Sequence, residues 1–447
     1  MKIGGIDWEG AHHEALEHLK ALLRIDTTNP PGNETAAARY VERILADAGI
    51  AAEVIESEPG RGSVVARIEG KGEGGPLLLA SHLDVVEAKA AAWKHPPFEA
   101  VEDAGWLYGR GAVDMKSMTA YALSTMLLLK RRGVVPRRDV ILAAVADEEE
   151  GGLRGMGHLV DRHPDRVRAE YALNEVGGFT FHVDGRRFYP VQVASKGFAW
   201  MTLRAEGPTG HGSIPREDGA VQRLAAAVER LRAQPLPIHV HPVVEGFVRR
   251  LAEGMPWWKG TVLKGVLSAS TADLVLGKLF PDRERARLFS ASLRNTACVT
   301  GLRAGGKANV IPGVAEATVD GRFVPGQTVE DLLREVRQVV GEGIAIDVFR
   351  SGPPTVTEAD TPLMQVIREV VPRHDPGAEV VPYLVVGFTD ALHLARLGVK
   401  TYGFAPVRLP TDVPFSSLFH ANDERIPVEG FRWGLETFFD VVAEFVA

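Results

Sequence analysis

Apolar and polar positions follow two alternating periods along the first 195 residues. Residues 8–24 and 35–48 place apolar side chains at helical spacing, and residues 115–133 do the same up to a glycine stop. Short apolar runs separated by turn residues predict strands at 51–57, 63–70, 76–86 and 139–146. Strands that alternate with helices of this length predict an α/β domain with a largely parallel sheet.

The pattern changes near residue 196. Residues 197–207 and 315–326 alternate like half-exposed strands, and the helix-like runs 218–233 and 328–343 follow them, which predicts an α+β domain. Residues 234–295, approximately, read as a mostly helical addition. The α/β rhythm resumes after residue 351. The sequence therefore predicts a catalytic domain in two parts, 1–195 and 351–447, with a second domain inserted at 196–350.

Composition narrows the class of partner. The chain has 447 residues, more than one hydrophobic core usually organises, which agrees with two domains. Its net charge is -7, and it has no dense block of Lys and Arg. The electrostatic signature of a nucleic-acid or anionic-membrane binder is absent, so we expect small-molecule or peptide chemistry.

Cysteine content and the N-terminal residues bear on location. Cys298 is the only cysteine, which excludes an internal disulfide framework and a thiolate-rich metal site. The N-terminal stretch has no apolar core of a signal peptide, and no run approaches the roughly 20 apolar residues of a membrane span. We therefore expect a cytoplasmic protein without a membrane partner.

Acidic residues and histidines stand at the downstream ends of apolar segments. In open α/β sheets, ligands collect outside the carboxyl ends of the strands, so distant segments can bring such residues to one rim. Each residue alone has a plainer explanation, such as a helix cap, a loop histidine or a solvated acidic run. Together, two imidazoles and several carboxylates without a thiolate suit zinc, cobalt or manganese. The candidates are His82, Asp114, Glu148, Glu149, Glu175 and His420.

Asp84 adds a detail to this prediction. A metal-bound histidine usually passes its other ring N–H to a carboxylate. Asp84 lies two residues after His82 and points the same way in an extended strand, so it is placed to accept that hydrogen bond. The alternative is that Asp84 merely opens a turn.

Short motifs along nearly the whole chain resemble those of the M20 family of co-catalytic metallopeptidases and aminoacylases. In order they are "SHLDVV" (81–86), "GRGAVDMK" (109–116), "DEEEGG" (147–152), "NE" (174–175), "GHGSIP" (210–215), "NVIPGVAEATVDGRFVPG" (309–326), "GFTDA" (387–391) and "HANDERI" (420–426). The resemblance implies an α/β catalytic domain with a mixed, largely parallel sheet and helices on both faces. It also implies that the inserted α+β domain is a lid or dimerisation domain.

The resemblance also implies a dinuclear metal centre. One ion would be held by His82 and Glu175 and the other by Glu149 and His420, with Asp114 bridging the two. Zinc is the first expectation, with cobalt or manganese as alternatives. Glu148 would be the general base, and Asp84 would support the centre as a further catalytic residue.

The inserted domain supplies further residues in the resemblance. His211 would support the oxyanion of the tetrahedral intermediate, and Asn309 and Arg322 would contact the substrate. Thr389, in the second part of the catalytic domain, would contact the substrate as well. In many family members the lid histidine and asparagine reach a neighbouring subunit, which implies a homodimer through this domain. The alternative is that the lid, enlarged by the addition at about 234–295, completes the site within one chain. One departure is Phe388, where the family often has glycine; it could narrow the substrate pocket or pack beneath it.

The predicted function is metal-dependent hydrolysis of an amide bond in an N-acyl amino acid or a short peptide with a free carboxylate. A biosynthetic deacylase of the acetylornithine or succinyl-diaminopimelate type, or a dipeptidase, remains an alternative within this class. A non-catalytic, metal-dependent binding protein is the alternative from another class. Glu148 argues against it, because binding alone needs no base.

Overall fold

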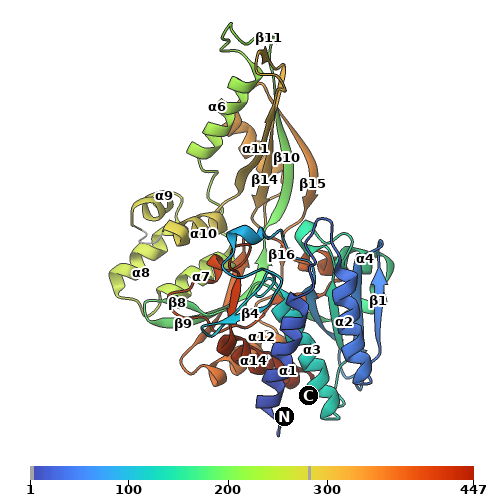
Figure 1. The fold of residues 1–447 in the computed structure, drawn as a ribbon. Helices are drawn as coiled ribbons and strands as arrows, with labels where there is room; N and C mark the ends of the chain where they lie inside the picture. Colours follow the sequence, from blue (N-terminus) through green and yellow to red (C-terminus); the bar gives the residue numbers. More distant parts are fainter. Residues whose placement is uncertain (1–4, 280–282) are drawn as a thin grey trace. The chain divides into compact units, whose positions relative to one another are not determined.

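The computed structural model describes residues 5–279 and 283–447. The chain forms two compact units (Figure 1). The first comprises Met1–Val193, Thr357–Tyr383 and Thr389–Ala447, and the second comprises Ala194–Val356 and Leu384–Phe388. Within the described part of the chain, no helix has the length and apolar character needed to cross a bilayer.

The first unit is built on a mixed sheet in the order β1-β2-β6-β3-β7-β18-β9. Its central strands β6, β3, β7 and β18 are parallel, whereas β1, β2 and β9 pair antiparallel. The strands are β1 (Ala52–Glu56), β2 (Gly62–Ile68), β3 (Leu77–His82), β6 (Val140–Val145), β7 (Tyr171–Asn174), β8 (Phe181–Val183), β9 (Arg186–Ser195), β17 (Glu379–Val385) and β18 (Lys400–Gly403), with a small separate sheet of β4 (Val101–Asp103), β5 (Trp106–Tyr108) and β19 (Arg425–Pro427).

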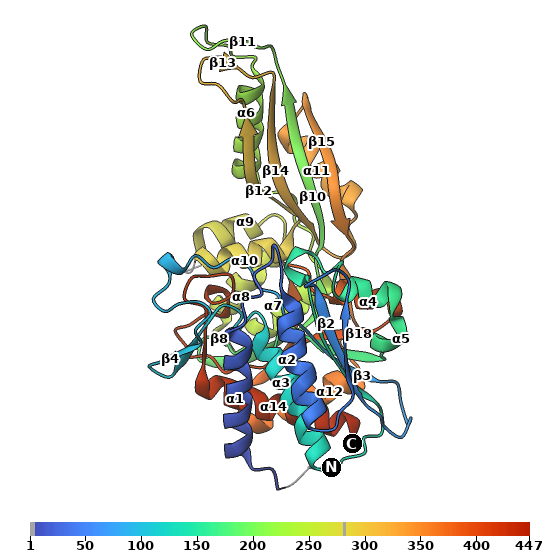
Figure 2. The same ribbon diagram turned by 45° about the vertical axis from the view of Figure 1, so that its right-hand side comes forward.

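Helices cover both faces of this sheet (Figure 2). On one face, Leu78 and Ala80 of β3 pack in a core with Met156 and Leu159. On the other face, Ser81 bonds with Thr119. The helices are α1 (Trp8–Leu23), α2 (Glu34–Asp47), α3 (Lys116–Arg131), α4 (Met156–Arg162), α5 (Pro164–Val167), α12 (Pro362–His374), α13 (Ala391–Leu394) and α14 (Val428–Val446). The predicted α/β class is confirmed.

The burial of the central strands agrees with their parallel pairing, because the helices that connect parallel strands cover both faces of the sheet. All residues of β3 and β6 are buried. Strands covered on both faces read as continuous apolar runs, which is the pattern of Val140–Val145. The strands β3, β6 and β7 are parallel neighbours, so their carboxyl ends lie at one edge of the sheet.

The second unit has an antiparallel sheet in the order β12-β14-β10-β15. Its strands are β10 (Gly197–Glu206), β12 (Thr296–Ala304), β14 (Val314–Phe323) and β15 (Ile344–Gly352), with the short strands β11 (Gly210–His211), β13 (Val310–Ile311) and β16 (Thr355–Val356). Its helices are α6 (Ala220–Ala233), α7 (Pro242–Ala252), α8 (Trp257–Lys264), α9 (Ala272–Leu274), α10 (Arg283–Leu293) and α11 (Val329–Val340). Helices α6 and α11 share one core with alternating residues of the sheet.

Candidate metal centre

Three predicted ligands meet where β3 and β7 end and α3 begins. The Nε2 atom of His82 lies 3.1 Å from Oδ1 of Asp114 and 3.3 Å from Oε2 of Glu175. The three residues each offer a ligand atom within 4.8 Å of the others. His82 is the last residue of β3, and Glu175 directly follows β7, so the parallel sheet brings these two side chains together.

A second group shares Asp114 with the first. The Nε2 atom of His420 lies 3.1 Å from Oδ2 of Asp114 and 3.1 Å from Oε2 of Glu149. These three ligand atoms also lie within 4.8 Å of one another. The two oxygens of Asp114 therefore face different histidines, which is the arrangement that a bridging carboxylate needs.

The pKa shifts in the cluster show that its buried carboxylates are stabilised by nearby positive charge. Burial, followed by the charge of Asp114, raises the pKa of Glu149 to about 7. Hydrogen bonds with Asp114 and then Glu149 raise the pKa of His420 to about 10. Burial alone would lower the pKa of His82, but the charge of Glu175 and the bond with Asp114 raise it well above its usual value. Metal cations at this position would stabilise the carboxylates in the same way as protonated imidazoles.

The donor set fits divalent metal ions. Imidazole nitrogens and carboxylate oxygens are ligands of zinc, cobalt and manganese. The Oε1 atom of Glu149 is buried and has no hydrogen-bond partner among the described residues. An unpartnered buried carboxylate oxygen is costly, and coordination would remove that cost. The geometry therefore supports a candidate centre for two ions, each with its own histidine.

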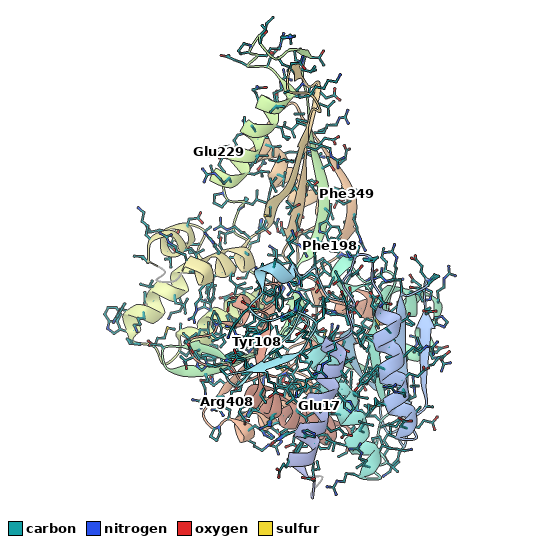
Figure 3. All side chains as sticks on the ribbon, viewed as in Figure 1. Glu17, Tyr108, Phe198, Glu229, Phe349 and Arg408 are labelled. Atoms are coloured by element: carbon teal, nitrogen blue, oxygen red, sulfur yellow. The ribbon has the colours of Figure 1, made fainter. Side chains whose placement is uncertain are left out.

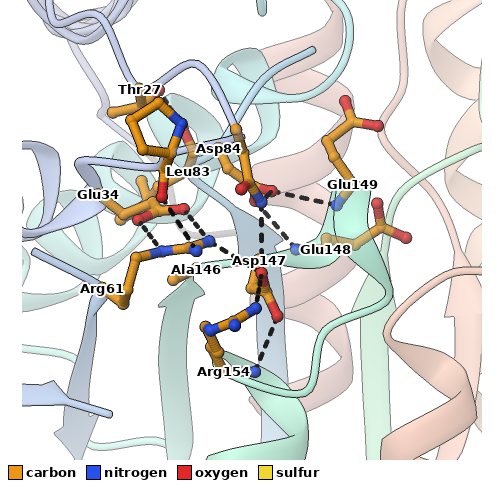
Figure 4. Close-up of polar contacts among 12 residues, drawn as sticks. Thr27, Glu34, Arg61, Leu83, Asp84, Ala146, Asp147, Glu148, Glu149 and Arg154 are labelled. Carbon is orange, nitrogen blue, oxygen red and sulfur yellow. Dashed lines mark hydrogen bonds and ion pairs between the residues drawn. The ribbon is translucent and has the colours of Figure 1, made fainter. Parts of the chain in front are cut away.

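Glu148 begins the short 3-10 turn that follows β6. Its backbone N–H donates to Oδ1 of Asp84 at 3.0 Å, and the residue is 6% exposed. Burial, followed by the charge of Glu175, raises its pKa well above the usual value. Figure 4 shows the carboxylates of Glu148 and Glu149 directed away from Asp147. A carboxylate with a raised pKa is a stronger proton acceptor, as a general base requires.

Asp84 makes different contacts from those expected. The Nδ1 atom of His82 lies 2.9 Å from the backbone carbonyl of Asp84 and 3.5 Å from its carboxylate. The Asp84 carboxylate instead accepts the backbone N–H groups of Glu148, at 3.0 Å, and Glu149, at 3.1 Å. Asp84 thus orients the imidazole mainly through its main chain, and its side chain fixes the turn that carries the acidic residues.

Asp147 belongs to a buried ion-pair network behind the centre (Figure 4). It lies 2.9 Å from Arg61, which also pairs with Glu34 at 2.8 Å. The amide of Asn29 joins Asp147, at 3.3 Å, to Asp84, at 2.9 Å. Asp147 adopts a left-handed backbone with φ 71°, an uncommon conformation for a residue with a Cβ that local contacts must hold. The acidic run therefore splits, because Asp147 is neutralised by Arg61 while Glu148 and Glu149 face the centre.

Glu424 is a supporting residue without a local sequence signal. Its carboxylate accepts the backbone N–H groups of Gly111, Val113 and Asp114 at 2.8 to 3.1 Å. It also pairs with Arg110 at 2.7 Å. The loop that presents Asp114 is therefore held by a residue 310 positions further along the chain. The motif "HANDERI" contained Glu424, but the resemblance assigned it no role.

Comparison with known proteins shows the family of this chain. The model of Peptidase family M20/M25/M40 matches residues 78–444. The chain belongs to this family. Among curated relatives, N-fatty-acyl-amino acid synthase/hydrolase PM20D1 of Bos taurus is 30% identical over 382 residues, which are 82% of this chain and 73% of the relative. Aminoacylase-1 of Sus scrofa is 27% identical over 444 residues, 96% of this chain and 95% of the relative.

Solved structures of M20 enzymes have the same fold. The metallo-carboxypeptidase Sso-CP2 from Sulfolobus solfataricus matches with a TM-score of 0.71 at 20% identity, covering 97% of this chain and 99% of that one. Human carnosine dipeptidase 1 matches with a TM-score of 0.70 at 15% identity, covering 98% and 97%. The predicted family is confirmed, and the chain is a hydrolytic enzyme of the M20 type.

The remaining predicted M20 residues lie in different places. His211 and Asn309 are exposed neighbours in the second unit, where Gly212 N–H donates to the Asn309 carbonyl at 2.8 Å. Arg322 stands near the far end of β14, opposite Phe198 of β10. Thr389 is buried in the first unit, and its hydroxyl accepts the N–H of Ala391 at the start of α13. Contact of Thr389 with substrate stays a prediction.

Phe388, the departure from the family pattern, packs against Arg322. Its ring centre lies 5.1 Å from the guanidinium carbon of Arg322 and 4.9 Å from the ring of Phe198. Arg322 also pairs with Asp320 at 2.7 Å, and its Nη1 atom is buried without a hydrogen-bond partner among the described residues. The two aromatic rings and Asp320 fix the position of the guanidinium.

Proposed function

We propose that this M20 enzyme hydrolyses the amide bond of N-acyl amino acids, with a dinuclear zinc centre and Glu148 as general base. The observation that supports this proposal best is that two groups of candidate ligands share Asp114. His82 and Glu175 form one group with it, and Glu149 and His420 form the other. Relatives at 27–30% identity are named for N-fatty-acyl amino acids and as an aminoacylase, which supports the substrate class. Cobalt or manganese would satisfy the same ligands.

The proposed chemistry divides between the ions and the chain. When bound, two divalent ions polarise the scissile carbonyl and lower the pKa of a water molecule. Glu148 accepts the proton of that water on its carboxylate and returns it to the departing amine. Asp84 holds the backbone of Glu148, so the base stays in one position throughout.

Substrate recognition in this proposal uses Arg322. Asp320 already accepts hydrogen bonds from Nε and Nη2 of Arg322, so Nη1 is the nitrogen proposed to donate to a substrate carboxylate. The buried, unpartnered Nη1 of Arg322 and the rings that flank it support a role in binding the free carboxylate of the substrate. A dipeptide and an N-acyl amino acid share this group, so Arg322 does not distinguish them.

The second unit is proposed to be a lid that also dimerises. His211 lies in β11, which pairs with β13. Arg322 lies about 26 Å along β14 from the first residue of that strand. Phe198 of β10 pairs with Arg322. Figure 3 shows Phe198 at one end of the four-stranded sheet, and Figure 1 shows β11 beyond its other end. The distance between His211 and Arg322 within the second unit supports separate roles for the two residues, with His211 and Asn309 proposed to reach a partner subunit. A single-chain molar mass by light scattering would contradict the dimer.

A substrate panel tests the proposed function. We expect zinc-loaded, cobalt-loaded or manganese-loaded protein to hydrolyse N-acyl amino acids faster than unsubstituted dipeptides, because the relatives with the higher identity are named for such substrates. The panel comprises N-acetyl and N-octanoyl phenylalanine, acetylornithine, succinyl-diaminopimelate and two dipeptides. Release of the free amine is measured.

Each outcome of the panel distinguishes one alternative function from the proposed one. Selective hydrolysis of acetylornithine or succinyl-diaminopimelate would indicate a biosynthetic deacylase, and selective hydrolysis of dipeptides a dipeptidase. No turnover of any of these compounds with any metal would contradict the proposed substrate class.

A further inference from the structure

The helical addition in the second unit carries two exposed tryptophans. They begin α8, where Trp257 is 83% exposed and Trp258 is 54% exposed. Further along the helix, Leu263 is buried, whereas Thr261 and Lys264 are exposed. Positions 257, 261 and 264 follow the spacing of one helix face, so α8 turns Leu263 inward and presents Trp257 and Lys264 to solvent. Large apolar side chains grouped at a surface mark a site of interaction.

A second segment extends this surface. It is the π-helical turn Val275–Leu279, which directly follows α9 and packs against α8. Leu274 is 51% exposed and Leu279 is 53% exposed, with the exposed Lys278 between them in the sequence. Figure 1 shows α8 and α9 in the same part of the second unit, outside its four-stranded sheet. The tryptophan surface is defined by Trp257, Trp258, Lys264, Leu274, Lys278 and Leu279.

The local charge is positive, although the whole chain is negative. Residues 254–279 contain one acidic residue, Asp273, and three lysines: Lys259, Lys264 and Lys278. Asp273 pairs with Arg294, which is buried, so its charge is offset within the protein. The net charge of -7 predicted no anionic-membrane partner, but that total conceals this local excess of positive charge.

Tryptophan, leucine and lysine together fit the surface of a lipid bilayer. Indole rings favour the headgroup level, aliphatic side chains reach the acyl boundary, and lysines attract anionic headgroups. A second copy of the chain fits less well, because a twofold interface sets the same patch against itself and brings like charges together. A single-stranded nucleic acid would stack on the indole rings but would leave the exposed leucines in water.

We propose that the tryptophan surface docks the enzyme on bilayers that contain anionic phospholipid. Trp257 and Trp258 enter the headgroup region, and the three lysines of residues 254–279 lie over the anionic headgroups. The inference goes beyond the proposed amide hydrolysis and does not depend on it, because docking requires neither the metal centre nor a substrate. It assigns a function to part of the helical addition.

Sedimentation with lipid vesicles tests the proposal. The full-length protein is mixed with vesicles of phosphatidylcholine alone, or with vesicles of equal parts phosphatidylcholine and phosphatidylglycerol. Each lysine close to an anionic surface contributes about fivefold to binding, so we expect at least about tenfold tighter binding to the anionic vesicles. Salt at about 0.5 M should remove most of this difference, because it screens the lysines.

Two sets of substitutions separate the apolar part of the surface from its charged part. Trp257→Ala combined with Trp258→Ala should weaken binding to anionic vesicles by about tenfold or more, because each indole buries a large apolar area. Lys259→Gln, Lys264→Gln and Lys278→Gln together should remove most of the preference for anionic over neutral vesicles. Tryptophan emission of the parent should shift to shorter wavelength with anionic vesicles, and the double tryptophan variant should lose this shift.

Matched controls remove the same groups elsewhere. Phe349→Ala deletes an exposed ring of β15 (Figure 3). Lys71→Gln, Lys89→Gln and Lys130→Gln together delete three exposed lysine charges of the first unit. Both control proteins should bind anionic vesicles like the parent.

Three results would overturn the proposal. The first is no binding of the parent to either kind of vesicle, or equal losses in the control and surface variants. The second is a dimer, measured by light scattering without lipid, that the double tryptophan variant loses, because the surface would then bind a second copy of the chain. The third is tighter binding to oligothymidylate than to anionic vesicles, which would assign the surface to single-stranded nucleic acid.

Discussion

We expect Glu148→Gln to lower kcat/KM for the preferred N-acyl amino acid by about 10² to 10⁴-fold, the usual contribution of a general base. The amide has the shape of the carboxylate but cannot accept a proton from water. The backbone N–H of Glu148 still donates to Asp84, so the turn should keep its position. Steady-state hydrolysis at saturating zinc measures the effect, and zinc titration verifies that the variant still binds metal.

Glu150→Gln is the matched control for this result. Glu150 belongs to the same 3-10 turn, Glu148–Glu150, but is exposed. Because Glu150 is exposed and is not one of the predicted ligands, we expect its kcat/KM to stay within about twofold of the parent. If Glu148→Gln retained the parent rate, another group would have to be the base.

The second large effect concerns stability. Replacing Arg61 by methionine should lower the free energy of unfolding by about 3–5 kcal/mol, because it leaves buried carboxylates without their cation. The side chains of Glu34 and Asp147 are 0% and 1% exposed, and Arg61 is 7% exposed. Guanidinium unfolding followed by circular dichroism measures the change.

Arg154→Met separates this burial effect from the loss of a positive charge near Asp147. The guanidinium of Arg154 lies 3.6 Å from Asp147 but is 45% exposed. Exposed ion pairs contribute about 0–1 kcal/mol, so we expect a loss within that range. Equal losses in the two variants would show that the buried network does not hold the turn.

The sequence predicted those parts of the fold that local patterns encode. The uninterrupted apolar run of β6 and the helical period of α3 are visible within single windows, and both elements form close to the predicted bounds. The candidate ligands could also be predicted, because the carboxyl ends of parallel strands lie at one edge of a sheet. His82 and Glu175 are brought to one edge by β3 and β7.

Contacts between distant residues could not be predicted in this way. Arg61 and Asp147 are 86 positions apart, and Arg110 and Glu424 are 314 apart. Neither pairing has a local period or a turn signal, so both became visible only in three dimensions. The side chain of Asp84 illustrates the same limit, since a strand pattern indicates its direction but not the two N–H groups that it accepts.

The interpretation of the acidic run depends on metal. Four adjacent acidic residues, Asp147 to Glu150, would repel one another on a bare surface. Arg61 offsets the charge of Asp147, and Glu149 lies against His420 and the oxygens of Asp114. Glu148 remains as a buried carboxyl group with a raised pKa. This division gives the run a catalytic part and a structural part.

Anomalous diffraction from crystals grown with zinc tests the dinuclear centre. We expect two zinc peaks per chain about 3.5–4 Å apart, the usual spacing of two-metal sites. One peak should contact His82 and Glu175, the other Glu149 and His420, and both should contact Asp114. A single peak, or two peaks that do not share Asp114, would contradict a dinuclear centre bridged by this residue.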